Sequence, residues 1–214
     1  MVKEINKEKM FLCSFFEKVA SLLPKFAGED LRGKTVAFIP TAGKHEEVNF
    51  FISTARQAFE NFGMKINDMD ISSIPKEEIA EQLDQSDYIY VSGGNTFFLL
   101  QELKRTGTDQ LIKEQILKGK PYIGESAGSI LVAPDISYMK CVNYSKEKAP
   151  LLKSFSALGV VDFYSVPHYK EEPFVEINDE VVRRYDKLLN LLPISNSQAV
   201  IVRGATREIV EVNK

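Results

Sequence analysis

Residues 124–128 read Gly-Glu-Ser-Ala-Gly, a G-x-S-x-G pattern that follows an apolar run directly. In a nucleophile elbow this pattern turns a strand sharply into a helix and lifts the serine into an exposed, strained position. The helix start would favour a developing negative charge, and the amide of Ala127 would donate to an oxyanion. The pattern therefore predicts that Ser126 is a nucleophile, although a tight βα turn without catalytic function would read the same.

A second candidate loop lies at residues 92–96, which read Ser-Gly-Gly-Asn-Thr after another apolar run. Two glycines permit a close approach of the backbone, and Asn95 or Thr96 suits the N-cap of a following helix. We expect the amide of Gly94 to complete an oxyanion hole beside Ser126. The alternative is a flexible turn with an ordinary helix cap.

A serine hydroxyl needs a general base, and histidine is the usual one near neutral pH. The chain has two histidines. His45 lies in a polar loop, where a solvated residue is the simpler interpretation. His168 follows the apolar run 163–166 directly, so we expect it at the same sheet edge as Ser126, with a packed structural histidine as the alternative.

The elements that must position these residues are short apolar runs alternating with amphipathic segments. This alternation predicts an α/β fold with a mostly parallel sheet. The predicted strands are 10–16, 35–40, 65–71, 87–92, 121–124 and 163–166, and the predicted helices are 17–26, 46–62, 76–85, 96–104 and 109–118. A helix over 179–192 and an antiparallel hairpin of strands 198–203 and 208–212, turning at Gly204, are expected to follow. No linker or repeat interrupts the chain, which predicts one domain over residues 1–214.

Composition narrows the classes of partner. The 27 basic and 30 acidic residues give a net charge of −3, which provides no general attraction to phosphate backbones or anionic lipids. No apolar run reaches 18 residues, and the charged residues 1–10 do not resemble a signal peptide. We expect neither nucleic-acid nor membrane partners. The distant Cys13 and Cys141 form no CxxC pair, which favours a reducing cytoplasm.

The segments 92–96 (Ser-Gly-Gly-Asn-Thr), 124–128 (Gly-Glu-Ser-Ala-Gly) and 167–169 (Pro-His-Tyr), in this order, resemble the signature segments of the dipeptidase E (aspartyl dipeptidase) family. Segments 11–14, 34–42 and 198–202 extend the similarity over most of the chain. The resemblance implies a flavodoxin-like three-layer αβα fold related to class I glutamine amidotransferase domains. It further implies hydrolysis of small peptides through Ser126 and His168, oxyanion donors at Gly94 and Ala127, and no metal or organic cofactor.

The sequence departs from the family at the third member of the triad, where the resemblance implies an acidic residue and this chain has Asn196. An asparagine can orient imidazole through its carbonyl oxygen but offers no counter-charge to imidazolium. Asn196 therefore predicts reduced activity, and a catalytically weakened member stays an alternative. Asp162 and Asp135 are candidate replacements for the acid.

The sequence leaves the choice of substrate open. Aspartyl specificity in the family relies on an arginine after the histidine, and Arg183 and Arg184 are candidates that fit solvated helix positions equally well. We assign Asn95 and Glu125 to substrate binding, Glu125 because a peptidase must recognise a free α-amino group. An esterase or amidase acting on another acyl compound would not need that recognition. A homodimer is left open as a further partner.

Overall fold

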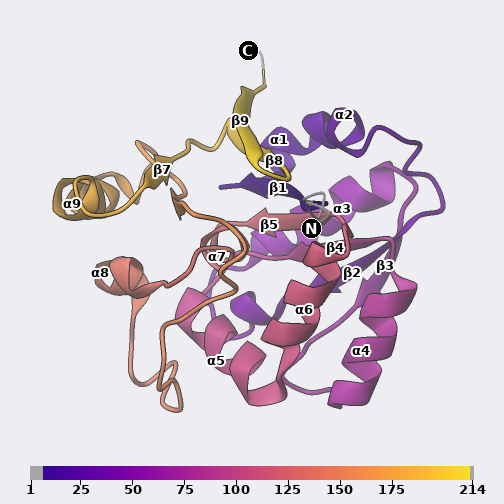
Figure 1. Cartoon of the computed structure of the whole chain (residues 1–214), viewed down its shortest axis with the longest axis horizontal. Helices are drawn as coiled ribbons and strands as arrows, with labels where there is room; N and C mark the ends of the chain where they lie inside the picture. Colours follow the sequence, from indigo (N-terminus) through magenta and orange to yellow (C-terminus); the bar gives the residue numbers. More distant parts are fainter. Residues whose placement is uncertain (1–6, 213–214) are drawn as a thin grey trace, which may run out of the picture.

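The computed structural model describes residues 7–212, so the charged segment 1–6 and residues 213–214 lie outside the description. A seven-stranded sheet forms the centre, with strand order β3-β2-β4-β5-β1-β8-β9, and β6 and β7 form a separate two-stranded sheet (Figure 1). The strands are β1 (Lys9–Cys13), β2 (Thr35–Ile39), β3 (Lys65–Asp68), β4 (Tyr88–Val91), β5 (Tyr122–Glu125), β6 (Tyr164–Val166), β7 (Leu191–Pro193), β8 (Gln198–Arg203) and β9 (Thr206–Glu211).

The five strands from β3 to β1 pair in parallel, whereas β8 pairs antiparallel with both β1 and β9. The prediction of a mostly parallel α/β sheet that ends in an antiparallel hairpin is confirmed. The neighbouring β4 and β5 end in the two loops that carry the glycine-rich segments. Because carboxyl ends of parallel strands meet at one sheet edge, this topology brings both loops together.

Helices cover both faces of the sheet (Figure 1). Buried side chains of α1, α2 and α3 pack on one face, and those of α4, α5, α6 and α7 pack on the other. The helices are α1 (Phe16–Val19), α2 (Leu23–Ala27), α3 (Phe50–Asn61), α4 (Lys76–Gln85), α5 (Thr96–Thr106), α6 (Thr108–Leu117), α7 (Ala127–Ile130), α8 (Lys140–Asn143) and α9 (Val175–Tyr185). This arrangement is a three-layer αβα sandwich.

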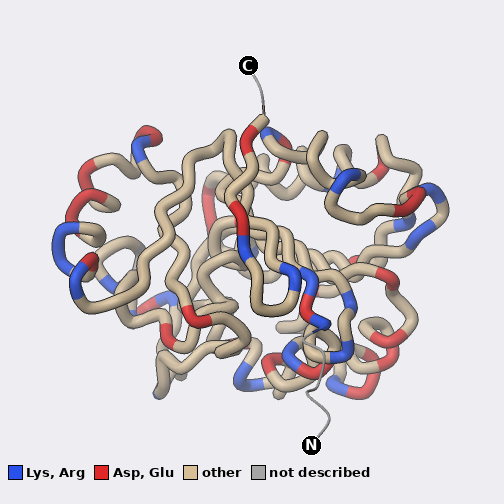
Figure 2. The backbone as a smooth tube through the Cα atoms, turned by 45° about the horizontal axis from the view of Figure 1, so that its top comes forward, with Lys and Arg blue, Asp and Glu red and all other residues tan. Residues whose placement is uncertain are grey.

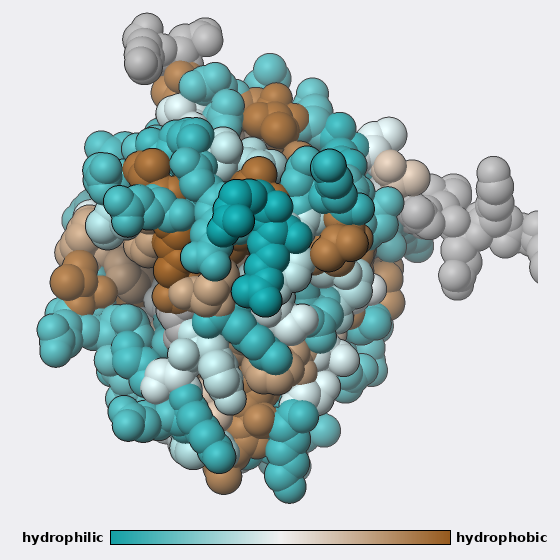
Figure 3. All heavy atoms as spheres, turned by 90° about the vertical axis from the view of Figure 1, so that its left-hand side faces the viewer, coloured by the Kyte–Doolittle hydropathy of each residue, from teal (hydrophilic) through white to brown (hydrophobic). Residues whose placement is uncertain are grey.

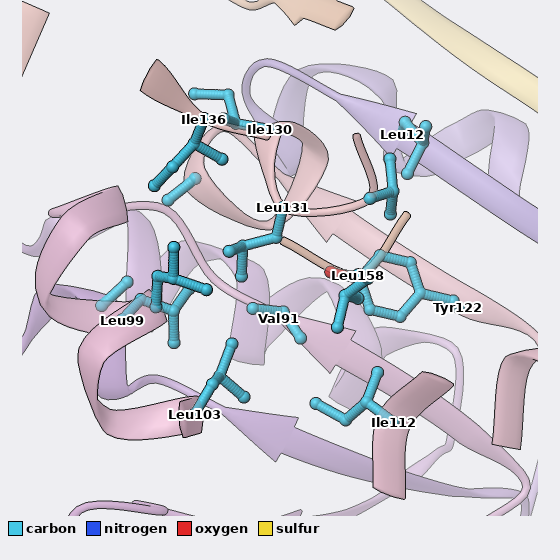
Figure 4. Packing of buried hydrophobic residues seen from close by; sticks show 14 of the residues in the cluster. Leu12, Val91, Leu99, Leu103, Ile112, Tyr122, Ile130, Leu131, Ile136 and Leu158 are labelled. Carbon is cyan, nitrogen blue, oxygen red and sulfur yellow. The ribbon is translucent and has the colours of Figure 1, made fainter. Parts of the chain in front are cut away.

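The larger core lies under α4 to α7 and continues to the β6–β7 sheet. Val91 of β4, Leu131 after α7 and Leu158 lie in one packed group (Figure 4). Val166 of β6 and Ile194 after β7 belong to the same buried cluster. The small sheet is therefore held to the main sheet by apolar packing.

The structure differs most from the predicted elements in three places. Residues 17–26 do not form one helix, because α1 gives way to a 3-10 turn (Ala20–Leu22) and α2 begins with Pro24 in its first turn. The helix expected over 179–192 begins earlier, at Val175, and ends at Tyr185, and residues 191–193 form β7 instead. Strand β6 pairs with β7 and not with the central sheet. His168 therefore follows a strand of the small sheet, whereas the sequence predicted that it follows a strand of the same sheet as Ser126.

Charged residues of both signs are distributed over the outer segments (Figure 2). On the face that carries α8 and α9, hydrophilic side chains surround separate hydrophobic spots (Figure 3). Within residues 7–212, the helices are too short or too polar to cross a membrane.

Candidate active site

Ser126 occupies a strained turn between β5 and α7, with φ 48° and ψ −102°. A positive φ is unfavourable for a residue with a side chain and marks a position held by its surroundings. The flanking glycines are required by space: a Cβ on Gly128 would lie 2.3 Å from the Val91 carbonyl oxygen, and one on Gly124 would lie 2.7 Å from the Gly128 carbonyl group. The G-x-S-x-G pattern therefore forms the predicted elbow.

The elbow is fastened to the neighbouring strand β1. The amide of Ser126 donates to the Cys13 carbonyl oxygen at 2.8 Å. The buried hydroxyl of Ser129 lies 2.8 Å from the same oxygen and 2.6 Å from the Gly124 carbonyl oxygen, and it accepts the Cys13 N–H at 3.0 Å. These bonds hold the serine backbone in its strained conformation.

His168 lies between the serine and the asparagine. Its Nε2 is 3.1 Å from Ser126 Oγ, and its Nδ1 is 2.7 Å from Asn196 Oδ1. The imidazole stacks on the ring of Phe174, with 4.8 Å between the centroids. The structure thus brings together the serine, the histidine and the asparagine that the sequence singled out, and their catalytic roles stay predictions.

The backbone of this loop holds the imidazole in place. His168 itself has φ 60°, and its amide donates to the buried hydroxyl of Ser14 at 2.9 Å. The same hydroxyl donates to the Ile194 carbonyl oxygen at 3.0 Å, which also links the loop to the end of β7. Ser14 therefore joins β1, the histidine loop and the asparagine loop.

The environment of His168 favours its neutral form. Burial lowers the pKa of His168 below its ordinary value, while the hydrogen bond to Asn196 and the charge of Glu171 raise it in part. With Asn196 Oδ1 accepting from Nδ1–H, Nε2 carries the lone pair that faces the serine hydroxyl. This is the tautomer that a general base requires.

The loop after β4 approaches the elbow closely. Gly94 has φ 127°, and a Cβ on it would lie 2.3 Å from the Ala42 carbonyl group, so only glycine fits. Ala127 begins α7 directly after the serine. Gly94 and Ala127 as the donors of an oxyanion hole stay a prediction.

Asn95 is the N-cap of α5. Its Oδ1 accepts the N–H groups of Phe97 and Phe98 at 3.1 and 2.9 Å. The side chain is buried, with 3% of its surface exposed. Of the two capping candidates, the structure selects Asn95, and substrate binding by this residue stays a prediction.

Glu125 has partners inside the protein. Its Oε1 accepts the Phe16 N–H at 2.8 Å, and its Oε2 accepts the Tyr90 hydroxyl. Burial raises the pKa of Glu125 to about 7, against hydrogen bonds from Tyr90 and from the Phe16 and Gly93 amides that lower it. These partners take both oxygens of a fully buried carboxylate, so the predicted contact between Glu125 and substrate is corrected. Glu125 instead supports the Gly93–Gly94 loop by accepting a hydrogen bond from the Gly93 amide.

The other candidates lie elsewhere. The carboxylate of Asp162 pairs with Arg207 at 3.1 Å, and Asp135 Oδ1 accepts the Ser137 N–H at 2.7 Å. Arg183 and Arg184 are exposed in the last turn of α9, and His45 is exposed with its ring edge against Phe98. Neither aspartate replaces the acid of the triad in this arrangement.

The sequence interpretation missed two residues. Ser14 follows β1 and gave no signal, because its bonds span 154 and 180 residues to His168 and Ile194. Glu171 accepts the Asn196 N–H at 3.2 Å, and it lies only three positions after His168. A search for acids next to the histidine in sequence could have found Glu171.

Among residues 7–212, no group of three or more His, Cys, Asp or Glu side chains is arranged to hold a metal ion.

A mostly parallel α/β sheet, a serine elbow and a histidine in contact with that serine are the arrangement of a serine hydrolase. Comparison with known protein families agrees: the model of peptidase family S51 matches residues 10–210. The chain belongs to peptidase family S51 and is a peptidase.

Individual relatives lead to the same family. An uncharacterized peptidase of Pasteurella multocida, PM1590, is 49% identical over 202 residues, which cover 94% of this chain and 97% of that protein. A Peptidase E of Shewanella amazonensis is 32% identical over 151 residues, which cover 70% of this chain and 60% of that protein. The crystal structure of the "Putative Peptidase E Protein" from Listeria monocytogenes EGD-e has a TM-score of 0.92 at 44% identity and covers 96% of this chain and 99% of that one.

Proposed function

We propose that this peptidase hydrolyses small peptides through Ser126 as nucleophile and His168 as general base. The observation that carries the proposal is the hydrogen-bonded series from Ser126 Oγ through the His168 ring to Asn196 Oδ1, at 3.1 and 2.7 Å. Both distances lie in the range expected for a nucleophile, its base and the group that orients the base.

In the proposed reaction, His168 Nε2 takes the proton of Ser126 as Oγ attacks the peptide carbonyl carbon. The amides of Gly94 and Ala127 donate hydrogen bonds to the oxyanion of the tetrahedral intermediate. The imidazolium then returns the proton to the leaving amine, and an acyl ester on Ser126 is left. Water, deprotonated by His168, hydrolyses this ester and restores the enzyme.

The weakened-member alternative makes a different prediction about Asn196. Loss of the correct histidine tautomer costs a serine triad roughly 10⁴ in turnover. Here Asn196 Oδ1 accepts from Nδ1 at 2.7 Å, which supports the correct tautomer without a carboxylate. We therefore propose that the enzyme is active, and that the missing carboxylate lowers turnover by less than a wrong tautomer would.

The surroundings of the serine support neutral substrates over aspartyl ones. A Cβ placed on Gly93 would lie 3.3 Å from Ser126 Cβ and 3.6 Å from a ring carbon of Phe51, so the Gly93 backbone lies next to both the nucleophile and this aromatic ring. Arg183 and Arg184, the arginines considered for aspartate recognition, are exposed on α9. We propose dipeptides with neutral amino-terminal residues as the preferred substrate class.

The test is hydrolysis of a neutral dipeptide, an aspartyl dipeptide, the N-acetylated neutral dipeptide and a simple acyl ester. We expect the neutral dipeptide to be cleaved fastest, and Ser126→Ala to abolish cleavage. Ser53→Ala, which removes an exposed hydroxyl on α3, is the matched control and should be fully active.

Cleavage that survives Ser126→Ala would disprove the nucleophile. Faster hydrolysis of the ester and of the N-acetylated compound than of the free dipeptide would favour the esterase or amidase alternative, because such an enzyme does not require the α-amino group.

A further inference from the structure

The third position of the triad is neutral in this chain, yet a carboxylate lies directly behind it. Glu171 Oε1 accepts the backbone N–H of Asn196 at 3.2 Å, while the side chain of Asn196 accepts from His168 Nδ1 at 2.7 Å. One residue therefore contacts both the imidazole and the carboxylate. The carboxylate is half-buried, so solvent screens its charge only in part.

The loop that carries His168 also fixes Glu171. The Glu171 amide donates to the His168 carbonyl oxygen at 3.1 Å, which closes a turn over residues 168–171. The Phe174 amide donates to the Glu171 carbonyl oxygen at 2.8 Å, and the Phe174 ring stacks on the imidazole. Both the histidine and the carboxylate are thus held by one short segment, at a fixed separation.

We propose that Glu171 is a positioning residue that supplies the counter-charge which Asn196 lacks. It holds the Asn196 loop through its backbone amide, and its negative charge stabilises the imidazolium that forms during the reaction. The function of the triad acid is thereby divided between two side chains: Asn196 selects the tautomer, and Glu171 provides the charge. This inference rests on the proposed function of Ser126 and His168.

The other groups packed against His168 do not provide this charge. Ser126 from the elbow, Ser14 from the end of β1 and Asn196 after β7 are neutral. Lys170 lies on the same loop, but its ammonium group is exposed and pairs with Asp179 of α9 at 2.7 Å. Consistent with this, the charge of Glu171 raises the pKa of His168, against the lowering by burial.

The first test measures the pKa of His168 by NMR titration without any substrate, so it does not depend on activity. The chain has two histidines, and a His45→Gln variant assigns the signals. We expect Glu171→Gln to lower the pKa of His168, and Glu171→Asp, which keeps the charge, to restore it in part. Glu172→Gln removes the exposed neighbouring carboxylate and should leave the pKa unchanged.

The second test is a double-mutant cycle on kcat. We expect Glu171→Gln to lower kcat about tenfold with little change in KM, well short of the roughly 10⁴-fold cost of a wrong tautomer. Asn196→Asp places a carboxylate directly on Nδ1, and it should recover this loss in the Glu171→Gln background. In the wild-type background the two carboxylates repel each other, so the gain should be smaller.

An equal gain from Asn196→Asp in both backgrounds would overturn the proposal, as would a His168 pKa that Glu171→Gln leaves unchanged. If Glu171→Gln does not fold, the same question is answered on the wild type. Salt that screens a half-exposed counter-charge should lower the pKa of His168, and an unchanged value would contradict the inference. A shifted pKa in a protein that cleaves no peptide would leave the inference standing and refute the proposed function alone.

Discussion

The imidazole of His168 lies in hydrogen-bond contact with two neutral groups, the Ser126 hydroxyl and the Asn196 amide. A fully charged triad would stabilise imidazolium more strongly and keep it protonated to a higher pH. Here burial lowers the pKa of the ring. The neutral imidazole is therefore available as a base at neutral pH. The same burial makes the imidazolium, which must form during catalysis, less favourable.

This balance predicts the pH dependence of activity. Because the pKa of His168 is below its ordinary 6.5, we expect the acid limb of kcat/KM to lie below pH 6.5. The same shift favours the folded state above pH 6.5, and this contribution is lost as the pH falls, since the unfolded chain takes up the proton first. The measurement is kcat/KM for a neutral dipeptide across the acid range, and an acid limb well above pH 6.5 would refute this account of the site.

Most site residues could be predicted from the sequence because local patterns encode them. The two glycines around Ser126 are fixed by contacts within their own loop and with the neighbouring strand, and His168 follows an apolar run. Ser14 could not be found this way, because its partner His168 lies 154 residues further along the chain. The burial of Glu125 also follows from the packing of several segments around it, which no local pattern reveals.

Among the elements, the central strands and α4 were the most predictable, because their periodicity is strong and their ends carry turn residues. The bounds of α4 (Lys76–Gln85) and β8 (Gln198–Arg203) agree with the sequence prediction. The segment 163–193 was less predictable. Its short strands β6 and β7 pair across 24 intervening residues, and the leucine-rich segment 188–192 fits a helix and a strand alike.

Helix α5 connects the core to the predicted oxyanion hole, because its N-cap Asn95 directly follows Gly94. Removing this cap with Asn95→Ala should destabilise the protein by about 1 kcal/mol, and loosening of the loop should lower kcat more than it raises KM. Chemical denaturation and steady-state kinetics measure the two effects. Asn49→Ala is the matched control, since Asn49 precedes α3 without capping it through its side chain. Equal effects of the two substitutions would contradict this role.

At the scale of the molecule, one buried cluster includes strand β1, the α4–α7 layer and the β6–β7 sheet. The histidine loop is therefore fastened to the same core as the serine elbow. The single domain over residues 1–214 stays a prediction. The continuity of this cluster means that ionisation of a buried group at the centre should affect unfolding of the whole chain.

Glu125 is that group. Its pKa is raised from 4.5 to about 7 in the folded protein, so the unfolded chain releases the proton first as the pH rises. The contribution of Glu125 to the stability of the folded state is therefore largest below pH 4.5, and about 3 kcal/mol of it should be lost between pH 4.5 and pH 7. Other groups titrate in this range, so the measurement is the difference between wild type and Glu125→Gln in denaturation at several pH values. A difference that does not change with pH would show that Glu125 does not titrate as described.

The central claim is that the strained, histidine-paired Ser126 is an activated nucleophile. Its most direct test is covalent labelling by a fluorophosphonate probe, which reacts with activated serines and requires no knowledge of the substrate. We predict that the wild type is labelled at Ser126, that His168→Gln reduces the rate of labelling strongly, and that Ser126→Ala abolishes labelling. A folded wild-type protein that is not labelled, or labelling that persists in Ser126→Ala, would contradict the account.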